Sequence, residues 1–326
     1  MRKDALMHIT IHNIVKNRLN KVNLDTNRSL RQLIDYGKTF STGRFQKYYL
    51  DLIQGVLKND NSNYFELIKK LTKETDQNRV LDFFINLGYD SWTYNASIIR
   101  EQTEKLNVKI PWLITLDTDE NTTLTNEEYI VSQAKDLGIN SFIINTNSRL
   151  CLERSLKLAS EFPRACFFIK TKAALCEDFP KESPNNCFIL LDLDDNFSLS
   201  TYQELKQQKL LIGSYSKKIN CQNIEEVIKE NSKKGILFTF VNNEKPNEKL
   251  YKEVLRIRNQ LTYPMILVDI FEDFMEVNQI ISNNNTTLEI SNNKITLGSG
   301  KDNFSYKSFV NTSHKTILEI LKELSN

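Results

Sequence analysis

Carboxylate and amide side chains follow several of the short apolar runs in the middle of the chain. In a parallel β/α barrel the carboxyl ends of the strands carry the chemistry, so such side chains converge on one mouth. The residues that we expect to contact a ligand there are Asp117, Asn145, Asn147, Asp192, Asp194 and Asp269. A carboxylate pair could act as general acid and base or bind a hard cation. The alternative is turn chemistry, because Asp is common in turns and at helix N-caps.

The cysteines, histidines and lysines form no recognisable catalytic pattern. The five cysteines all follow residue 150, contain no CxxC or CxxxC pair and are expected to be reduced core thiols. His8 and His12 share a helix face, but no third ligand accompanies them, so we predict no metal site. Without a histidine in a barrel loop, a Ser or Cys nucleophile has no base. Four lysines after predicted strands are expected to be solvated, although they could steer an anion: Lys170, Lys172, Lys217 and Lys218.

Short apolar runs alternate with helical patterns from residue 110 onward. The predicted strands are 110–116, 141–145, 166–169, 187–191, 210–214, 235–241 and 265–270. The helices predicted between them are 126–137, 150–161, 200–208, 224–231 and 247–260. This alternation is typical of βαβ units and a parallel sheet. Because no GxGxxG or P-loop motif is present, it favours an incomplete barrel over a nucleotide-binding sheet.

The two ends of the chain differ from this alternating middle. Residues 1–107 predict a helical N-terminal domain, with Gly88 as a helix stop between patterns at 78–87 and 92–106. Residues 274–326 predict short strands at 277–281, 287–290 and 294–297, followed by a closing helix at 314–324. The predicted fold is therefore α/β: an incomplete parallel (β/α) TIM-like barrel over 108–273, with a helical domain before it and a hairpin-and-helix extension after it.

Composition excludes several classes of protein. The 326 residues are 40% hydrophobic and 26% charged, with 43 basic and 41 acidic side chains well mixed along the chain. A nucleic-acid-binding protein would need a concentrated basic surface, so we predict no nucleic-acid partner. No apolar run approaches the ~18 residues of a membrane span, and the start lacks a signal-peptide core. We therefore expect a cytoplasmic protein without a transmembrane segment.

Nearly the whole chain resembles one branch of the radical S-adenosylmethionine (SAM) superfamily, the branch of hopanoid adenosyltransferases and related lipid-modifying enzymes. The resemblance begins at 110–117, which is similar to the first strand of their barrel, and continues with the Leu-Gly turn at 137–140. Residues 250–258 resemble their last barrel helix, and 263–271 resemble the strand after it. Residues 290–297 resemble the hairpin that carries their C-terminal cysteines.

The residues that carry out chemistry in that superfamily are absent from this chain. The loop that would hold the CxxxCxxC cluster ligands is 118–123, and no cysteine occurs before residue 151. The Gly-Gly-Glu motif that would hold the SAM amino group is replaced by 146–148. Gly298 stands about where a C-terminal cysteine would be, and 277–285 lacks the usual Gly-Cys. The resemblance therefore implies a degenerate member with no iron–sulfur cluster, even after anaerobic reconstitution.

Two functions remain open at this point. The first is a non-catalytic protein that acts by binding, as a regulator, scaffold or substrate-presenting partner of an intact radical SAM enzyme. The second is a repurposed barrel enzyme, a hydrolase or lyase, that uses the mouth carboxylates with or without a divalent metal. Residual SAM binding is possible in either case but is not predicted.

Overall fold

The structure is a computed structural model. It describes residues 3–22, 24–40, 44–121, 124–180, 182–243, 245–260, 262–291, 294–299, 305–310 and 315–325.

Helices make up the first third of the chain, as the sequence predicts. They are α1 (Lys3–Val22), α2 (Thr26–Phe40), α3 (Arg44–Val56), α4 (Asn63–Glu74), α5 (Gln77–Ile85), η1 (Asn86–Asn95) and α6 (Ala96–Leu106). The Asp76 side chain starts α5 by accepting the backbone N–H groups of Asn78 and Arg79. The prediction that Gly88 ends this helix is wrong, because η1 is a π-helical stretch that joins α5 directly to α6. Asn107, in the left-handed conformation, is the residue that ends the run.

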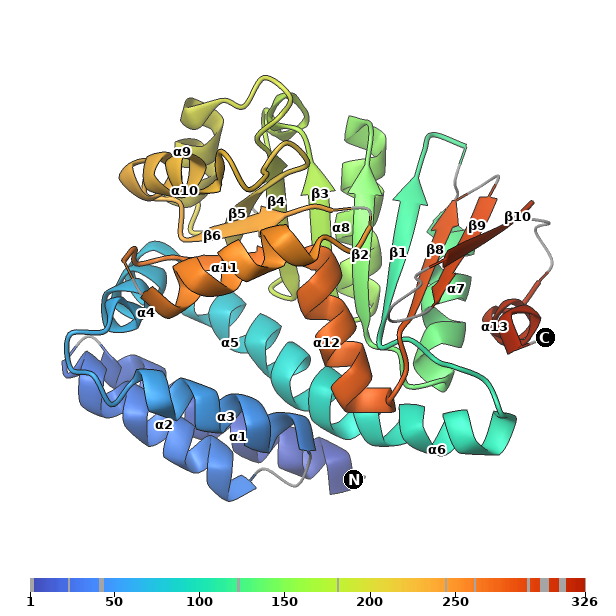
Figure 1. Ribbon diagram of the computed structural model, residues 1–326, viewed down its shortest axis with the longest axis horizontal. Helices are drawn as coiled ribbons and strands as arrows, with labels where there is room; N and C mark the ends of the chain where they lie inside the picture. Colours follow the sequence, from blue (N-terminus) through green and yellow to red (C-terminus); the bar gives the residue numbers. More distant parts are fainter. Residues whose placement is uncertain are drawn as a thin grey trace.

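The strands of the described residues form one mixed sheet of ten strands. Its order is β10-β9-β8-β1-β2-β3-β4-β5-β6-β7, and strands β8 and β1 to β7 are parallel (Figure 1). The strands are β1 (Leu113–Thr118), β2 (Ser141–Thr146), β3 (Cys166–Thr171), β4 (Cys187–Asp192), β5 (Ile212–Ser216), β6 (Phe238–Val241), β7 (Ile266–Asp269), β8 (Thr286–Ser291), β9 (Lys294–Ser299) and β10 (Ser305–Val310). Since β7 and β8 are the two ends of the parallel run and are not paired, the barrel is incomplete. The predicted fold class is confirmed.

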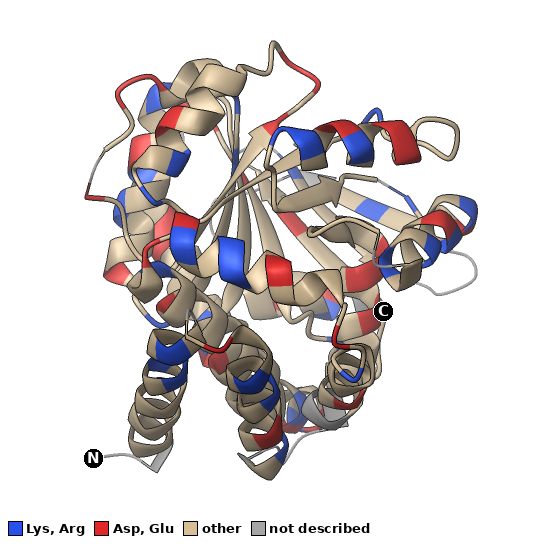
Figure 2. Ribbon diagram, turned by 90° about the vertical axis from the view of Figure 1, so that its left-hand side faces the viewer, with Lys and Arg blue, Asp and Glu red and all other residues tan. Residues whose placement is uncertain are grey.

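Helices follow the strands of the sheet, and one of them, α12, lines the inside of the incomplete barrel. They are α7 (Leu124–Asp136), α8 (Arg149–Glu161), the 3₁₀ turn η2 (Ala173–Cys176), α9 (Leu199–Gln207), α10 (Ile224–Lys233), α11 (Glu248–Gln260), α12 (Ile270–Ser282) and α13 (Ile317–Ser325). Charged side chains of both signs are interspersed on these helices (Figure 2). No helix of the described ranges is long and apolar enough to cross a membrane.

The C-terminal region differs from its prediction in three ways. Residues 277–281 belong to α12 and not to a strand, because the segment is the second half of a capped helix. Strand β10 is not foreseen. Strand β8 pairs in parallel with β1, so the predicted hairpin extension continues the barrel sheet. The turn residues Asn292 and Asn293, and His314 at the start of the predicted closing helix, lie outside the described residues.

A single large core joins the N-terminal helices to the sheet. It includes Leu19 of α1, Phe83 of α5, Ile144 of β2 and Leu321 of α13, all nearly inaccessible to water. Aromatic rings also connect the N-terminal helices to the barrel. The ring centroids of Trp92, in η1, and Trp112 are 5.8 Å apart, and those of Trp112 and Phe274, in α12, are 5.4 Å apart. The base of the barrel is therefore packed against the first hundred residues.

Candidate functional site

A cavity of about 770 Å³ lies inside the incomplete barrel. This volume is within the range of small-molecule sites, roughly 300–1,000 Å³. Polar side chains project into it from the ends of several strands: Thr115, Asp117, Asn145, Lys170, Asp192, Tyr215 and Glu289. The opposite wall is apolar and comes from α12 and the segment before β1: Trp112, Ile270, Phe271, Phe274 and Met275. The cavity thus combines a charged wall with an aromatic one.

Two acids stand side by side on the neighbouring strands β1 and β8. The register pairs Thr115 of β1 with Glu289 of β8. Because side chains alternate along a strand, Asp117, two residues after Thr115 on β1, points to the same face of the sheet as Glu289. Asp117 accepts a hydrogen bond from the Asn145 side chain. Although water reaches Glu289, the cavity walls and the adjacent Asp117 raise the pKa of its carboxyl to about 7. One of the two acids is therefore readily protonated near neutral pH.

A tyrosine–carboxylate pair lies on the next part of the charged wall. The Tyr215 hydroxyl, at the end of β5, donates to Asp192 Oδ2 at 3.3 Å. Burial and the nearby Asp192 charge raise the pKa of Tyr215 far above its ordinary value. The hydroxyl consequently stays protonated at physiological pH and acts as a donor.

Lys170 is the most unusual group in the cavity. It comes from β3, and only 6% of the residue is exposed. Its Nζ donates to Asn242 Oδ1 at 2.7 Å and lies 5.4 Å from the centre of the Tyr215 ring. Burial, and then the nearby positive charge of Lys217, lower the pKa of the amine to about 8. The expectation that Lys170 is a solvated surface lysine is therefore wrong.

The structure separates the six sequence-predicted contacts into two groups. Asp117, Asn145 and Asp192 line the cavity together. The other three serve local structure: Asn147 accepts from the Cys151 thiol at 3.3 Å, and Asp194 accepts from the backbone of Lys217 at 2.6 Å. Asp269 is fully buried and caps α12, accepting from the N–H groups of Phe271 and Glu272, both at 3.0 Å. The hydrogen bonds of these three residues are those of turns and helix caps, which is the alternative interpretation that the sequence also allows.

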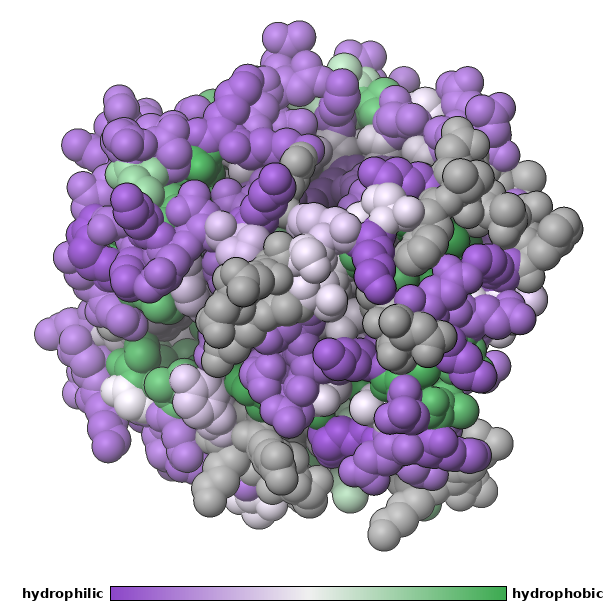
Figure 3. Space-filling view, turned by 45° about the vertical axis from the view of Figure 1, so that its right-hand side comes forward, coloured by the Kyte–Doolittle hydropathy of each residue, from purple (hydrophilic) through white to green (hydrophobic). Residues whose placement is uncertain are grey.

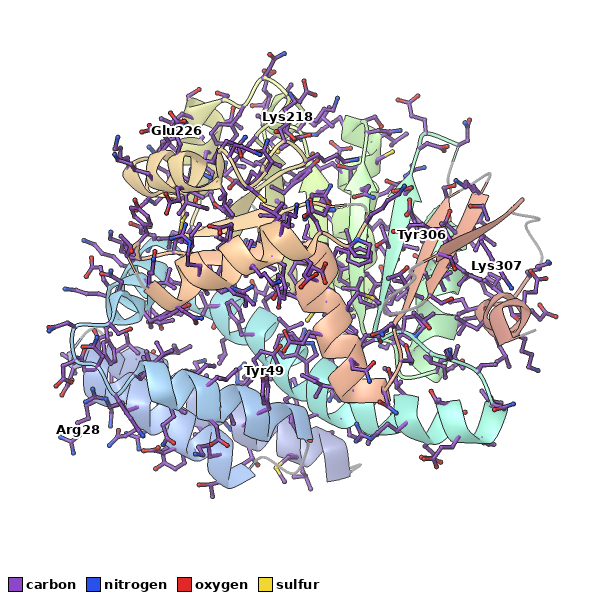
Figure 4. The ribbon with its side chains drawn as sticks, viewed as in Figure 1. Arg28, Tyr49, Lys218, Glu226, Tyr306 and Lys307 are labelled. Atoms are coloured by element: carbon purple, nitrogen blue, oxygen red, sulfur yellow. The ribbon has the colours of Figure 1, made fainter. Side chains whose placement is uncertain are left out.

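Sequence reasoning missed Tyr215 and Glu289, and it considered Lys170 only as a solvated lysine that could steer an anion. The signal for Lys170 was present, because a lysine directly continues the fully apolar run 166–169. Glu289 lies in a segment predicted as part of a separate hairpin, and only its pairing with β1 brings it to the cavity. Lys218, by contrast, is exposed beyond the end of β5, whereas Tyr306 reaches the cavity from β10 at the far edge of the sheet (Figure 4).

The residues of this chain do not fit an iron–sulfur cluster, which is held by thiolates. The segment after β1 begins with Asp119 and Glu120, and Thr122 and Thr123 lie outside the described residues. Cys151 lies in the first turn of α8, where its sulfur accepts a hydrogen bond from the Ser148 hydroxyl at 3.2 Å. Four of the five thiols are buried, and Cys221 is exposed, contrary to its predicted core position. Across the described ranges, no three His, Cys, Asp or Glu side chains are grouped to hold a metal ion.

The two helix histidines are used as structural partners. His8 Nδ1 lies 2.9 Å from Asp90 Oδ2, and His12 Nε2 lies 3.1 Å from Asp82 Oδ1. Each therefore ties α1 to a different part of the helix run α5–η1.

Comparison with known proteins gives a distant structural similarity. No family model matches the sequence, and no curated protein matches it. Crystal structures of SuiB from Streptococcus suis are similar over 68% of this chain, with a TM-score of 0.46. The structure bound to S-adenosylmethionine has 15% sequence identity over 66% of SuiB, and the one bound to the precursor peptide SuiA has 15% over 67%. A third, of SuiB, has 14% identity over 68%. Similarity at this level supports no inference about activity or ligands.

Proposed function

We propose that this protein is a non-catalytic radical SAM-like protein that acts by binding, in the cytoplasm, as a regulator, scaffold or substrate-presenting partner of an active radical SAM enzyme. The observation that carries the proposal is a barrel cavity without cluster ligands beside it. The cavity is well formed, yet the loop after the first strand contains no cysteine, and the first cysteine of the chain is Cys151. A cavity of about 770 Å³ with both charged and aromatic walls is suited to holding a small ligand. Reductive SAM cleavage, however, requires a cluster that these residues do not fit.

The surface is compatible with a polar, reversible contact to a partner. Hydrophilic side chains dominate the face in Figure 3, with only small hydrophobic areas between them. Non-obligate protein interfaces are about as polar as the rest of a protein surface. A transient complex fits this face better than an obligate apolar one.

The experiment is a pull-down from the native host with the full-length protein as bait. We expect an intact CxxxCxxC protein to be enriched, and the bait to bind neither stoichiometric iron nor sulfide after anaerobic reconstitution. Asp192→Asn serves as the matched variant, because Asp192 lines the cavity and the change removes its charge with little change of side-chain size. Stoichiometric cluster on the bait, or turnover by the bait alone, would contradict the proposal.

A repurposed hydrolase or lyase is the second candidate. The observation that favours it is the Asp117–Glu289 pair, since a carboxyl with a pKa of about 7 suits general acid–base catalysis. Glu289→Gln and Asp192→Ala should abolish such an activity while partner capture persists. Asp269→Ala is unsuitable for this comparison because Asp269 is a buried helix cap.

A further inference from the structure

We propose that Lys170 binds a small aldehyde or ketone in the barrel cavity by forming an imine with it. This inference rests on the proposed function, because it names the chemical class of ligand that the binding protein would hold. It adds a reversible covalent bond to what would otherwise be a site of hydrogen bonds and packing.

The first argument is the placement of the amine. Lys170 is buried but lines the cavity, and its Nζ donates to the amide oxygen of Asn242. No carboxylate of the described residues lies within 4.0 Å of it. Lys172, only two residues further on, is half exposed and lies 2.6 Å from Asp195 Oδ2. A buried ammonium without a counter-ion is costly, so the environment favours the neutral amine.

The second argument is the fraction of reactive amine. Four charged groups face Lys170 from other elements: Lys217 after β5, Asp117 of β1, Asp192 of β4 and Glu289 of β8. Burial and the positive charge of Lys217 lower the pKa of the amine by more than the three negative charges raise it, so this pKa falls to about 8. At pH 7 roughly 9% of such an amine is neutral, against roughly 0.03% of an ordinary lysine. Buried lysines of this kind are the ones that proteins use to form Schiff bases.

The chemistry is balanced without any oxidant or reductant. The Nζ lone pair attacks the carbonyl carbon, a C–N bond forms, and the carbonyl oxygen takes up a proton to become a hydroxyl. The hydroxyl then leaves as water with a second proton, the C–O bond breaks, and the nitrogen gives up its two protons to leave a C=N bond. The net change is amine plus carbonyl to imine plus one water.

Groups that can carry these protons line the same cavity. Glu289, with a pKa of about 7, is present in both its acid and base forms near neutral pH. The Tyr215 hydroxyl, held by Asp192, is a second donor close to the lysine. The aromatic wall of Trp112 and Phe274 limits water on the opposite side, which slows hydrolysis of the imine.

The test is reductive trapping on the full-length protein. Propanal, an uncharged probe, and pyruvate, an anionic one, are each incubated with the protein and sodium cyanoborohydride at pH 7, and modified peptides are mapped by mass spectrometry. We expect Lys170 to be modified at least about tenfold faster than Lys172 because of its larger neutral fraction. Preference for pyruvate would specify an anionic carbonyl ligand, and preference for propanal an uncharged one. Modification of Lys172 at an equal or greater rate would overturn the proposal.

Two further measurements keep the test independent of folding and of the proposed function. In the unmutated protein, acetylation of Lys170 by acetic anhydride, which reacts with the neutral amine, should reach half its maximum rate near pH 8, whereas a midpoint above pH 10 would contradict the proposal. Lys170→Arg should remove the dominant adduct. If trapping fails but the partner is still captured, the imine is refuted and the binding function stands.

Discussion

At the scale of single residues, the sequence identified the polar ends of strands better than it identified which of them enter the barrel. Asp117, Asn145 and Asp192 line the cavity, whereas Asp194 and Asp269 bind backbone N–H groups. A strand end and a helix cap attract the same residue type for different reasons, and the local sequence does not separate them. The burial of a lysine depends on the curvature of neighbouring strands, which is set by contacts far away in the chain.

Glu127 of α7 gives a residue-scale prediction about pH and stability. It is 1% exposed, neither carboxylate oxygen has a hydrogen-bond partner in the described part of the chain, and burial raises its pKa to about 7. Its folded-state pKa exceeds the unfolded value of about 4.3, so the folded protein binds the proton more tightly. The stabilisation that this provides is complete below pH ~4 and is lost as the pH rises through 7.

The variant Glu127→Gln should therefore be more stable than the parent above pH 7, by about 2 kcal/mol in the free energy of unfolding at pH 8. At pH 5 the difference should be well under half of that. Urea denaturation at the two pH values measures it, and Glu128→Gln, at a partly exposed neighbouring position, is the control. Equal stabilisation at both pH values would show that ionisation of Glu127 is not the cause.

At the scale of elements, most strands and helices from residue 110 to 269 were predictable because each shows a clear apolar period. Helix α12 was not, since residues 277–281 taken alone, Val-Asn-Gln-Ile-Ile, are a short stretch of mixed polarity that suits a strand as well as a helix. The deciding signal stands upstream: Asp269 caps the helix, and Glu272 follows three residues later, as in a capping box. Pairing of β8 with β1 could not be predicted, because about 170 residues separate them and no local pattern encodes a partner.

Gly138, between α7 and β2, gives a prediction about how η1 and α6 pack against the barrel. Its φ is +89°, and a Cβ there would lie 2.9 Å from both the Asn95 carbonyl oxygen and the Ile99 nitrogen. Gly138→Ala should therefore cost roughly 3 kcal/mol or more, from the strained φ and from a clash with backbone that cannot yield.

The matched control is Gly235→Ala, since Gly235 has a similar φ of +74° but its nearest neighbour is the flexible Lys206 amine at 3.1 Å. The control should cost only about 1–2 kcal/mol, the strain alone. Chemical denaturation of both variants gives the comparison. If the two costs are the same, the close contact of Gly138 with η1 and α6 contributes nothing.

At the scale of the whole molecule, the sequence predicts three domains with boundaries after residues 107 and 273. The structure places a continuous core across both boundaries and joins β8 to the barrel sheet. Asp90, 1% exposed in η1, adds a polar link: its carboxylate meets His8 of α1 and Arg164 just before β3. Helices and barrel should consequently unfold together and not as separate units.

Asp90→Ala tests this directly. Removing this buried carboxylate breaks its contacts with both His8 and Arg164, which should lower the free energy of unfolding by about 3 kcal/mol. Asp82 offers a matched control, because it also links α1, through His12, to a loop of the barrel at Asn185, yet its side chain is 32% exposed. Asp82→Ala should cost at most about 1 kcal/mol.

In both variants, each made with Trp92 replaced by Phe so that Trp112 at the barrel base is the one tryptophan, we expect circular dichroism and tryptophan fluorescence to report one coincident transition, because the core that crosses residue 107 remains intact. Two separate transitions in Asp90→Ala, with the helices melting first, would instead show that residues 1–107 form an independent domain that Asp90 holds in place.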